Sequence, residues 1–75
     1  MDRTEFLLVI DELLEVDPGT LKGTERLDEL ESWNSLAVIG FMAIVSERFG
    51  TIVQPKKISA CTTVEDLVIL AGVSN

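Results

Sequence analysis

Histidine is absent from this 75-residue chain, and cysteine occurs only once, as Cys61. Without histidine the chain can form no Ser-His or Cys-His nucleophile pair, no His-ligated metal site and no histidine general base. One cysteine permits neither an intramolecular disulfide nor a Cys-ligated zinc site, so Cys61 is interpreted as a small buried apolar residue. The spacing of the acids contains no EF-hand loop. We therefore expect neither a metal site nor an enzyme.

Basic residues are also scarce. Six Lys and Arg stand against thirteen Asp and Glu, which gives a formal net charge of −7, and the cations are scattered except for the pair Lys56 and Lys57. Nucleic acid is not an expected partner, because phosphate backbones require a basic stripe. The acidity favours partners with basic docking patches. The simpler alternative is that the charge only keeps a small apolar domain in solution.

Long apolar runs are missing as well. No stretch of about twenty apolar residues exists, so no membrane span is expected. No signal peptide is visible, since the first apolar segment contains Asp11 and Glu12. The cytoplasm is the expected location. The length allows one domain, residues 1–75, and the 47% hydrophobic content is that of a folded chain, which we expect to be a monomer.

Residues 4–15 have the pattern of an amphipathic helix that Asp2 or Thr4 can cap. The expected inner residues are Phe6, Leu7, Ile10, Leu13 and Leu14, and the expected polar face holds Glu5, Asp11, Glu12 and Glu15. Asp17-Pro18-Gly19 ends this helix. Residues 18–34 then form a long connection, and a connection of this length in so small a domain normally has a purpose. Its leucines, Leu21, Leu27 and Leu30, are expected to attach it to the core.

A second helix is predicted over residues 35–49, with Gly50 at its end. Its body, residues 36–45, is apolar on nearly every side. Such a helix should be buried all round, which a 75-residue domain can hardly achieve. Part of it is therefore expected to form an exposed apolar patch of the kind that marks a partner or ligand surface.

The rest of the chain is expected to add one short and one full helix. Ile52 and Val53 are interpreted as a buried loop segment, and residues 55–60 as one helical turn with Pro at its first position. A further helix starts near residues 62–66, where Thr62 with Glu65, or Thr63 with Asp66, fits the capping-box pattern. It should turn Val64, Leu67, Val68 and Ala71 inward and end near Gly72. The predicted fold is all-α: a small bundle of three main helices plus one short helix.

Ser35 is the residue on which a functional interpretation depends. It stands at the start of the second helix, where an ordinary N-cap serine is common. The alternative is an attachment point, because a phosphate on this hydroxyl would meet the positive end of the helix dipole and free N–H groups. The local pattern alone leaves both interpretations open.

The order of motifs along the whole chain resembles the acyl carrier proteins, a phosphopantetheine-binding carrier family. In that family an Asp-Ser-Leu motif opens the second helix, and Asn34-Ser35-Leu36 stands at the matching place. Phe49-Gly50 closing that helix and residues 62–67 opening the last one also fall where the family has them. Trp33 before the motif is similar to stand-alone carriers of bacterial secondary-metabolite or surface-polysaccharide gene sets.

The resemblance implies a mechanism and a set of partners. A phosphopantetheinyl transferase would move 4′-phosphopantetheine from coenzyme A to Ser35. The thiol of the arm would carry cargo as a thioester, while acyl- or aminoacyl-loading and acyl-transferring enzymes perform the chemistry. Fatty acyl, polyketide, hydroxyacyl and aminoacyl cargo all fit, so the pathway, including fatty-acid biosynthesis, stays open.

The family pattern also implies which residues meet partners. Leu36, Ile39, Ala43 and Glu47 would line the partner-facing side of the second helix, and Val38, Phe41, Met42, Val45 and Phe49 would face the core or an acyl pocket. Trp33 and Asn34 flank the motif, and the acids Asp28, Glu29 and Glu31 precede it. All of these apart from the inward-facing five are candidate recognition residues.

Three departures from the family pattern point to a specialised set of partners. Asn34 replaces the usual Asp where the transferase commonly docks. Gly40 and Ser46 occupy positions that are often acidic, and Lys56 and Lys57 add positive charge to the third helix. The competing hypothesis is an unmodified helical interaction module with a degenerate carrier fold.

Overall fold

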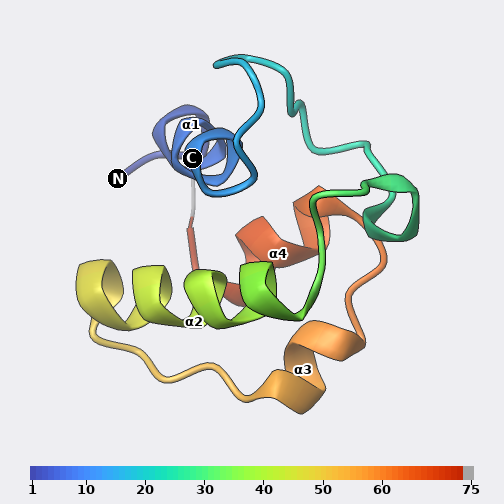
Figure 1. Cartoon of the computed structure of the whole chain (residues 1–75). Coiled ribbons are helices and arrows are strands. Elements are labelled where there is room, and N and C mark those ends of the chain that lie inside the picture. The colour runs from blue at the N-terminus through green and yellow to red at the C-terminus, as the bar shows by residue number, and fades with distance from the viewer. Residues whose placement is uncertain (74–75) are drawn as a thin grey trace.

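The structure is a computed structural model that describes residues 1–73. In this part of the chain it forms four α-helices and one 3-10 turn: α1 (Arg3–Leu13), η1 (Leu27–Glu29), α2 (Ser35–Phe49), α3 (Pro55–Ser59) and α4 (Val64–Leu70). Figure 1 shows α1 lying across α2, with α4 packed behind them and the short α3 at the other side of α2. The described residues include no strand, and the all-α prediction with one short helix and a long first loop is confirmed.

The first helix forms where its sequence predicts, and Asp2 is its cap. The Asp2 carboxylate accepts a hydrogen bond from the Glu5 amide at 2.8 Å. The helix ends two residues earlier than expected, because Glu15 adopts a left-handed conformation with φ 58°. The Val16 amide then donates to the Asp11 carbonyl at 3.0 Å and the Glu15 amide to the Glu12 carbonyl at 3.1 Å. This is a Schellman ending, which usually has glycine where Glu15 stands.

Asp11 corrects the predicted polar face of this helix. We expected its side chain in solvent, but it is 1% exposed. Its carboxylate accepts hydrogen bonds from the Gly19 amide at 2.8 Å and the Leu21 amide at 3.0 Å. The loop after α1 folds back over this side of the helix, so Asp11 supplies an acceptor to the Leu21 amide, which would otherwise be buried without a partner.

The long connection is attached to the core at several points. Leu21 and Leu27 are buried and Leu30 is half-buried against the core, which confirms the expectation for these leucines. The connection also pairs with the chain entering α4: the Leu27 amide donates to the Thr62 carbonyl at 2.9 Å and the Val64 amide to the Glu25 carbonyl at 3.0 Å. The η1 turn within it was not predicted.

One apolar core joins the helices. Phe6 of α1 and Phe41 of α2 pack edge to face, with ring centroids 6.1 Å apart. Such an aromatic pair contributes about 0.5–1.5 kcal/mol beyond the area it buries. Val45 of α2, Ile58 of α3 and Leu67 of α4 are buried in the same cluster. The core therefore holds α2 through the side that bears Phe41 and Val45.

The chain after α2 follows the prediction in outline. Val53 is buried, but Ile52 is 84% exposed, so the prediction that both are buried is wrong for Ile52. An extended chain turns successive side chains to opposite sides.

In α4 the capping box is formed by Thr63 and Asp66. Amides of residues 62 and 63 donate to Asp66 and lower the pKa of its carboxyl.

The remaining expectations for this region are mostly met. The four residues expected to face inward from the last helix are all buried: Val64, Leu67, Val68 and Ala71. Cys61, expected to be buried, is only half-buried at the end of α3, and its partial removal from water raises the pKa of its thiol. Within residues 1–73 no helix has the length and apolar character required to cross a membrane.

Asp11→Ala should destabilise the fold by about 1–3 kcal/mol, because it leaves the buried Leu21 amide and the part-buried Gly19 amide without their charged acceptor. Urea unfolding followed by circular dichroism measures the loss. Glu12→Ala, on the exposed side of the same turn, is the control and should change stability by less than about 0.5 kcal/mol. Equal effects of the two substitutions would contradict the anchoring role of Asp11.

Candidate functional site

Ser35 is the first residue of α2 and not its N-cap, which corrects the structural interpretation given above. The cap is Asn34, whose backbone is extended and whose side-chain oxygen accepts a hydrogen bond from the Ala37 amide at 2.9 Å. Asn34 caps the helix because its side chain reaches the third amide from an extended backbone. Ser35 is exposed, and its hydroxyl makes no hydrogen bond to any residue between 1 and 73. The hydroxyl is therefore available for chemistry.

The start of α2 offers a favourable place for a phosphate. The first amides of a helix have no acceptor within it, and the helix dipole gives this end partial positive charge. The first turn of α2 contains no acidic residue that would oppose an anion. A phosphate ester on Ser35 Oγ would thus lie beside unpartnered N–H groups, so the residues present fit a phosphate-linked prosthetic group.

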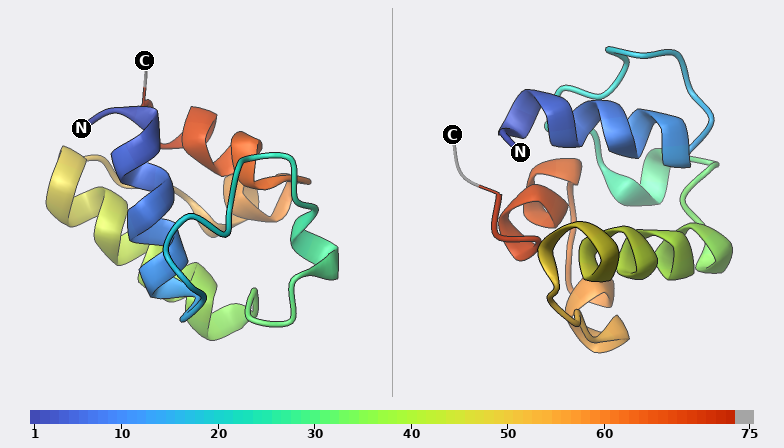
Figure 2. Two further views of the ribbon diagram at one scale, coloured as in Figure 1. Left: turned by 90° about the horizontal axis from the view of Figure 1, so that it is seen from above. Right: turned by 90° about the vertical axis from the view of Figure 1, so that its left-hand side faces the viewer.

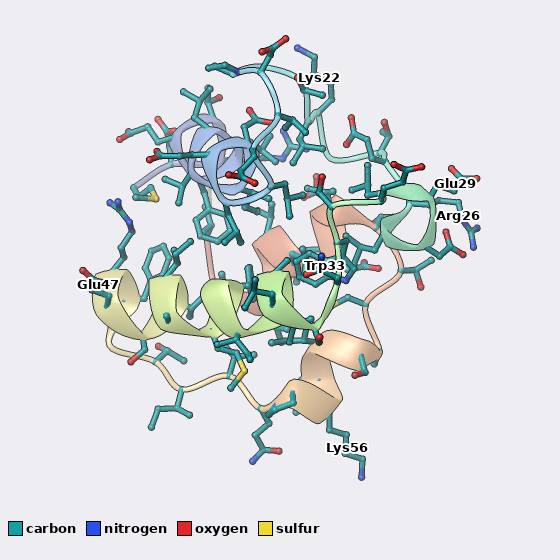
Figure 3. The ribbon with its side chains drawn as sticks, in the orientation of Figure 1. Lys22, Arg26, Glu29, Trp33, Glu47 and Lys56 are labelled. Carbon is teal, nitrogen blue, oxygen red and sulfur yellow. The ribbon has the colours of Figure 1, made fainter. Side chains whose placement is uncertain are left out.

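The predicted recognition residues of α2 lie on one exposed stripe. Leu36 is 75% exposed and Ile39 is 62% exposed, and Ala43 and Glu47 continue the same side of the helix. Glu47 lies at the far end of α2 (Figure 3). It is about 18 Å along the axis from Ser35 at 1.5 Å per residue. The structure therefore brings Leu36 and Ile39 next to Ser35, but not Glu47.

The opposite side of α2 packs inward. Phe41 and Val45 are fully buried, and the other three residues expected there, Val38, Met42 and Phe49, are half-buried against the core. Trp33 is half-buried, and its ring meets that of Phe41 edge to face at 6.2 Å between centroids. Figure 3 shows Trp33 beside the first turns of α2. The contact with Phe41 therefore accounts for the half-buried position of the Trp33 ring.

The acidic residues before the motif differ in their pairing. Asp28 forms a two-bond ion pair with Arg26, at 3.1 Å from Nε and 3.0 Å from Nη2. This hydrogen bonding to Arg26 lowers the pKa of the Asp28 carboxyl, and the same pairing raises the pKa of Arg26. Glu29 and Glu31 are exposed and form no ion pair with a described residue. Their charges are more available to a partner than that of Asp28.

A groove of about 580 Å³ runs beside Ser35, between the end of α1 and the first half of α2. Both views of Figure 2 show these two helix ends side by side. Its wall on α2 comes from Leu36, Ile39 and Gly40, and its floor and rim on α1 from Glu12, Leu13, Leu14 and Glu15. The sequence gives no sign that the α1 residues lie here, because only the packing of the two helices brings them to this place.

Gly40 explains how closely the two helices approach at this groove. A Cβ atom built on Gly40 would lie 2.5 Å from Leu13 Cδ1, inside the range that real contacts exclude. A residue with a side chain at this position would require the Leu13 side chain to move. The missing side chain of Gly40 therefore leaves room for Leu13 at the groove.

Together, the fold and the site define the class of protein to which the chain belongs. The fold is a small helical bundle that presents the exposed hydroxyl of Ser35 at the positive end of its second helix. Residues 1–73 contain no cluster of His, Cys, Asp or Glu that could hold a metal ion. These are the features of a carrier domain.

The comparison with protein-family models agrees with this class. The model of the family described as "phosphopantetheine attachment site" matches residues 5–70, and the chain belongs to that family. Its members carry a covalently attached 4′-phosphopantetheine group and are non-catalytic carriers, so the chain is not an enzyme. No curated protein and no solved structure matches the chain.

Asn34→Ala should cost about 1 kcal/mol of stability, because it removes the cap of α2. Ser35→Ala should change stability by less than about 0.5 kcal/mol, because the Ser35 side chain is exposed and unpaired. Urea unfolding of the two variants, in the unmodified protein, tests the division of roles. A larger loss for Ser35→Ala would mean that Ser35 itself holds the helix start.

Proposed function

We propose that the chain carries acyl or aminoacyl groups as thioesters on a 4′-phosphopantetheine arm attached to Ser35, and presents them to partner biosynthetic enzymes. The supporting observation is the exposed, unpaired Ser35 hydroxyl at the start of α2, inside a chain that belongs to the phosphopantetheine-attachment family. Among the serines of the chain, Ser35 is the candidate for attachment because it stands at the place of the family's motif.

Each part of the helix start has a role in this proposal. Ser35 Oγ forms the new bond to the phosphorus that bears the pantetheine arm, the pyrophosphate bond of coenzyme A breaks, and the adenosine nucleotide leaves. The serine proton passes to a base of the transferase. Asn34 keeps the first turn in place, and the free amides of that turn stabilise the phosphodiester charge. When attached, the arm supplies a terminal thiol that holds the cargo.

The wider setting is part of the same proposal. The chain acts as one domain, residues 1–75, since one core cluster takes residues from α1 through α4. We place it in the cytoplasm as a monomer, where a phosphopantetheinyl transferase and the loading and transferring enzymes are its partners. Its recognition surface consists of the exposed residues near Ser35, chiefly Leu36 and Ile39, with the unpaired acids Glu29 and Glu31.

Incubation with coenzyme A and a broad-range phosphopantetheinyl transferase should add the mass of one phosphopantetheine group. Ser35→Ala should abolish the addition, because the accepting oxygen is gone. Ser46→Ala, an exposed serine on the same helix, is the matched control and should be modified like the wild type. Intact-mass spectrometry measures all three, and addition to the Ser35→Ala variant would refute the assignment.

Asn34→Asp should speed this modification if the missing carboxylate limits docking of the transferase. The cap is retained, since an Asp side chain accepts the same amide hydrogen bond and suits the helix dipole. Initial rates at equal protein concentration measure the effect, and an unchanged or slower rate would show that charge at this position is not limiting.

Protein from the native host that stays uniformly unmodified beside an active transferase would favour the unmodified interaction module.

A further inference from the structure

The groove between α1 and α2 carries charge of one sign only. Its lining includes the carboxylates Glu12 and Glu15 and the apolar side chains of Leu13, Leu36 and Ile39, but no Lys or Arg. Neither glutamate forms a hydrogen bond or ion pair through its carboxylate with any residue in the described part of the chain. The groove therefore lacks a positive counterpart that its own chain would supply.

The shape and charge of the groove select the kind of occupant. An aliphatic chain would gain from Leu13 and Ile39 but would gain nothing from the two carboxylates, whose desolvation costs free energy. A second copy of this chain is disfavoured by a net charge of −7 on each molecule. A polypeptide segment with an apolar side chain between Lys or Arg residues satisfies both features, because its cations meet the carboxylates while the apolar group enters the groove.

The position of the groove selects which protein brings that segment. Asn34 and Leu36, the two neighbours of Ser35, both line it. An enzyme that forms a bond at Ser35 Oγ must cover these neighbours, so its surface reaches the α2 wall of the groove. The α1 wall lies directly opposite, where the end of α1 approaches α2 (Figure 2).

We propose that the groove between α1 and α2 is the docking site for a basic, apolar-tipped segment of the phosphopantetheinyl transferase, with Glu12 and Glu15 of α1 as its charge partners. This inference rests on the proposed function and extends the recognition surface from α2 to α1. The contact holds the transferase beside Ser35, while Glu12 and Glu15 take no part in the bond changes.

The test separates docking from modification by mapping the complex without coenzyme A. The ¹⁵N-labelled chain is titrated with unlabelled broad-range transferase, and amide signals are followed by NMR. The largest shifts are expected at Leu13, Leu36, Ile39 and Gly40, and the affinity should fall as salt rises. Shifts confined to α3 and α4, or the absence of any shift, would overturn the groove as the docking site.

Two matched substitutions test the α1 carboxylates. Glu12→Gln should raise the Kd, and the KM for modification, about two- to fivefold with kcat unchanged, the range expected for one exposed charge pair. Glu5→Gln removes the same charge from the same helix, outside the groove, and should leave both constants unchanged. Equal effects of the two substitutions would mean that net charge acts alone, which would overturn the proposal.

A third substitution separates docking from stability. Glu15→Gly removes the second carboxylate and places glycine at a left-handed position, so the variant should unfold at a higher temperature and yet bind the transferase more weakly. Weaker binding without loss of stability supports a docking role, and unchanged binding contradicts it.

The two proposals fail in distinguishable ways. Wild type that never gains the phosphopantetheine mass refutes the proposed function, whatever the NMR map shows. Wild type that is modified normally, with no shift in the groove, refutes only the docking site. Groove shifts that appear on loading an acyl group, and not on adding the transferase, would assign the groove to cargo and overturn the inference.

Discussion

The helix that bears the motif is apolar on nearly every side, and the rest of the 75 residues has too little surface to cover it. Phe6 and the rest of the core meet the side that carries Phe41 and Val45. The opposite side, with Leu36 and Ile39, stays in water. This incomplete burial fixes the orientation of α2 about its axis, and it leaves an apolar stripe that begins beside Ser35.

The start of α2 divides its tasks between neighbouring residues. Asn34 satisfies the Ala37 amide, so the helix does not require the Ser35 hydroxyl for capping. If serine occupied the cap position, its oxygen would accept a backbone hydrogen bond and would not be free as an attachment point. Further along the helix, the missing side chain of Gly40 leaves room for Leu13 of α1. Small residues thus shape the surroundings of the proposed attachment site.

Much of the fold was predictable because it depends on local patterns. The bounds of α2 follow from its apolar body and from Gly50, and the inward residues of α4 follow from helical spacing. Asp11 was not predictable, because an acid between apolar residues looks solvent-exposed until the following loop covers it. Ile52 was wrongly expected to be buried with Val53, because an extended chain turns successive side chains to opposite sides.

The sequence by itself determined the helices, the acidity and the family, because periodicity, charge and the order of motifs are properties of the chain alone. It also singled out Ser35, although not that its hydroxyl is free of the cap. Tertiary structure decided where the acids of α1 lie: the following loop covers Asp11, whereas Glu12 and Glu15 face the groove against α2. The physical reason is that pairing and exposure depend on which segments distant in sequence come into contact, and periodicity within one helix carries no information about its neighbours.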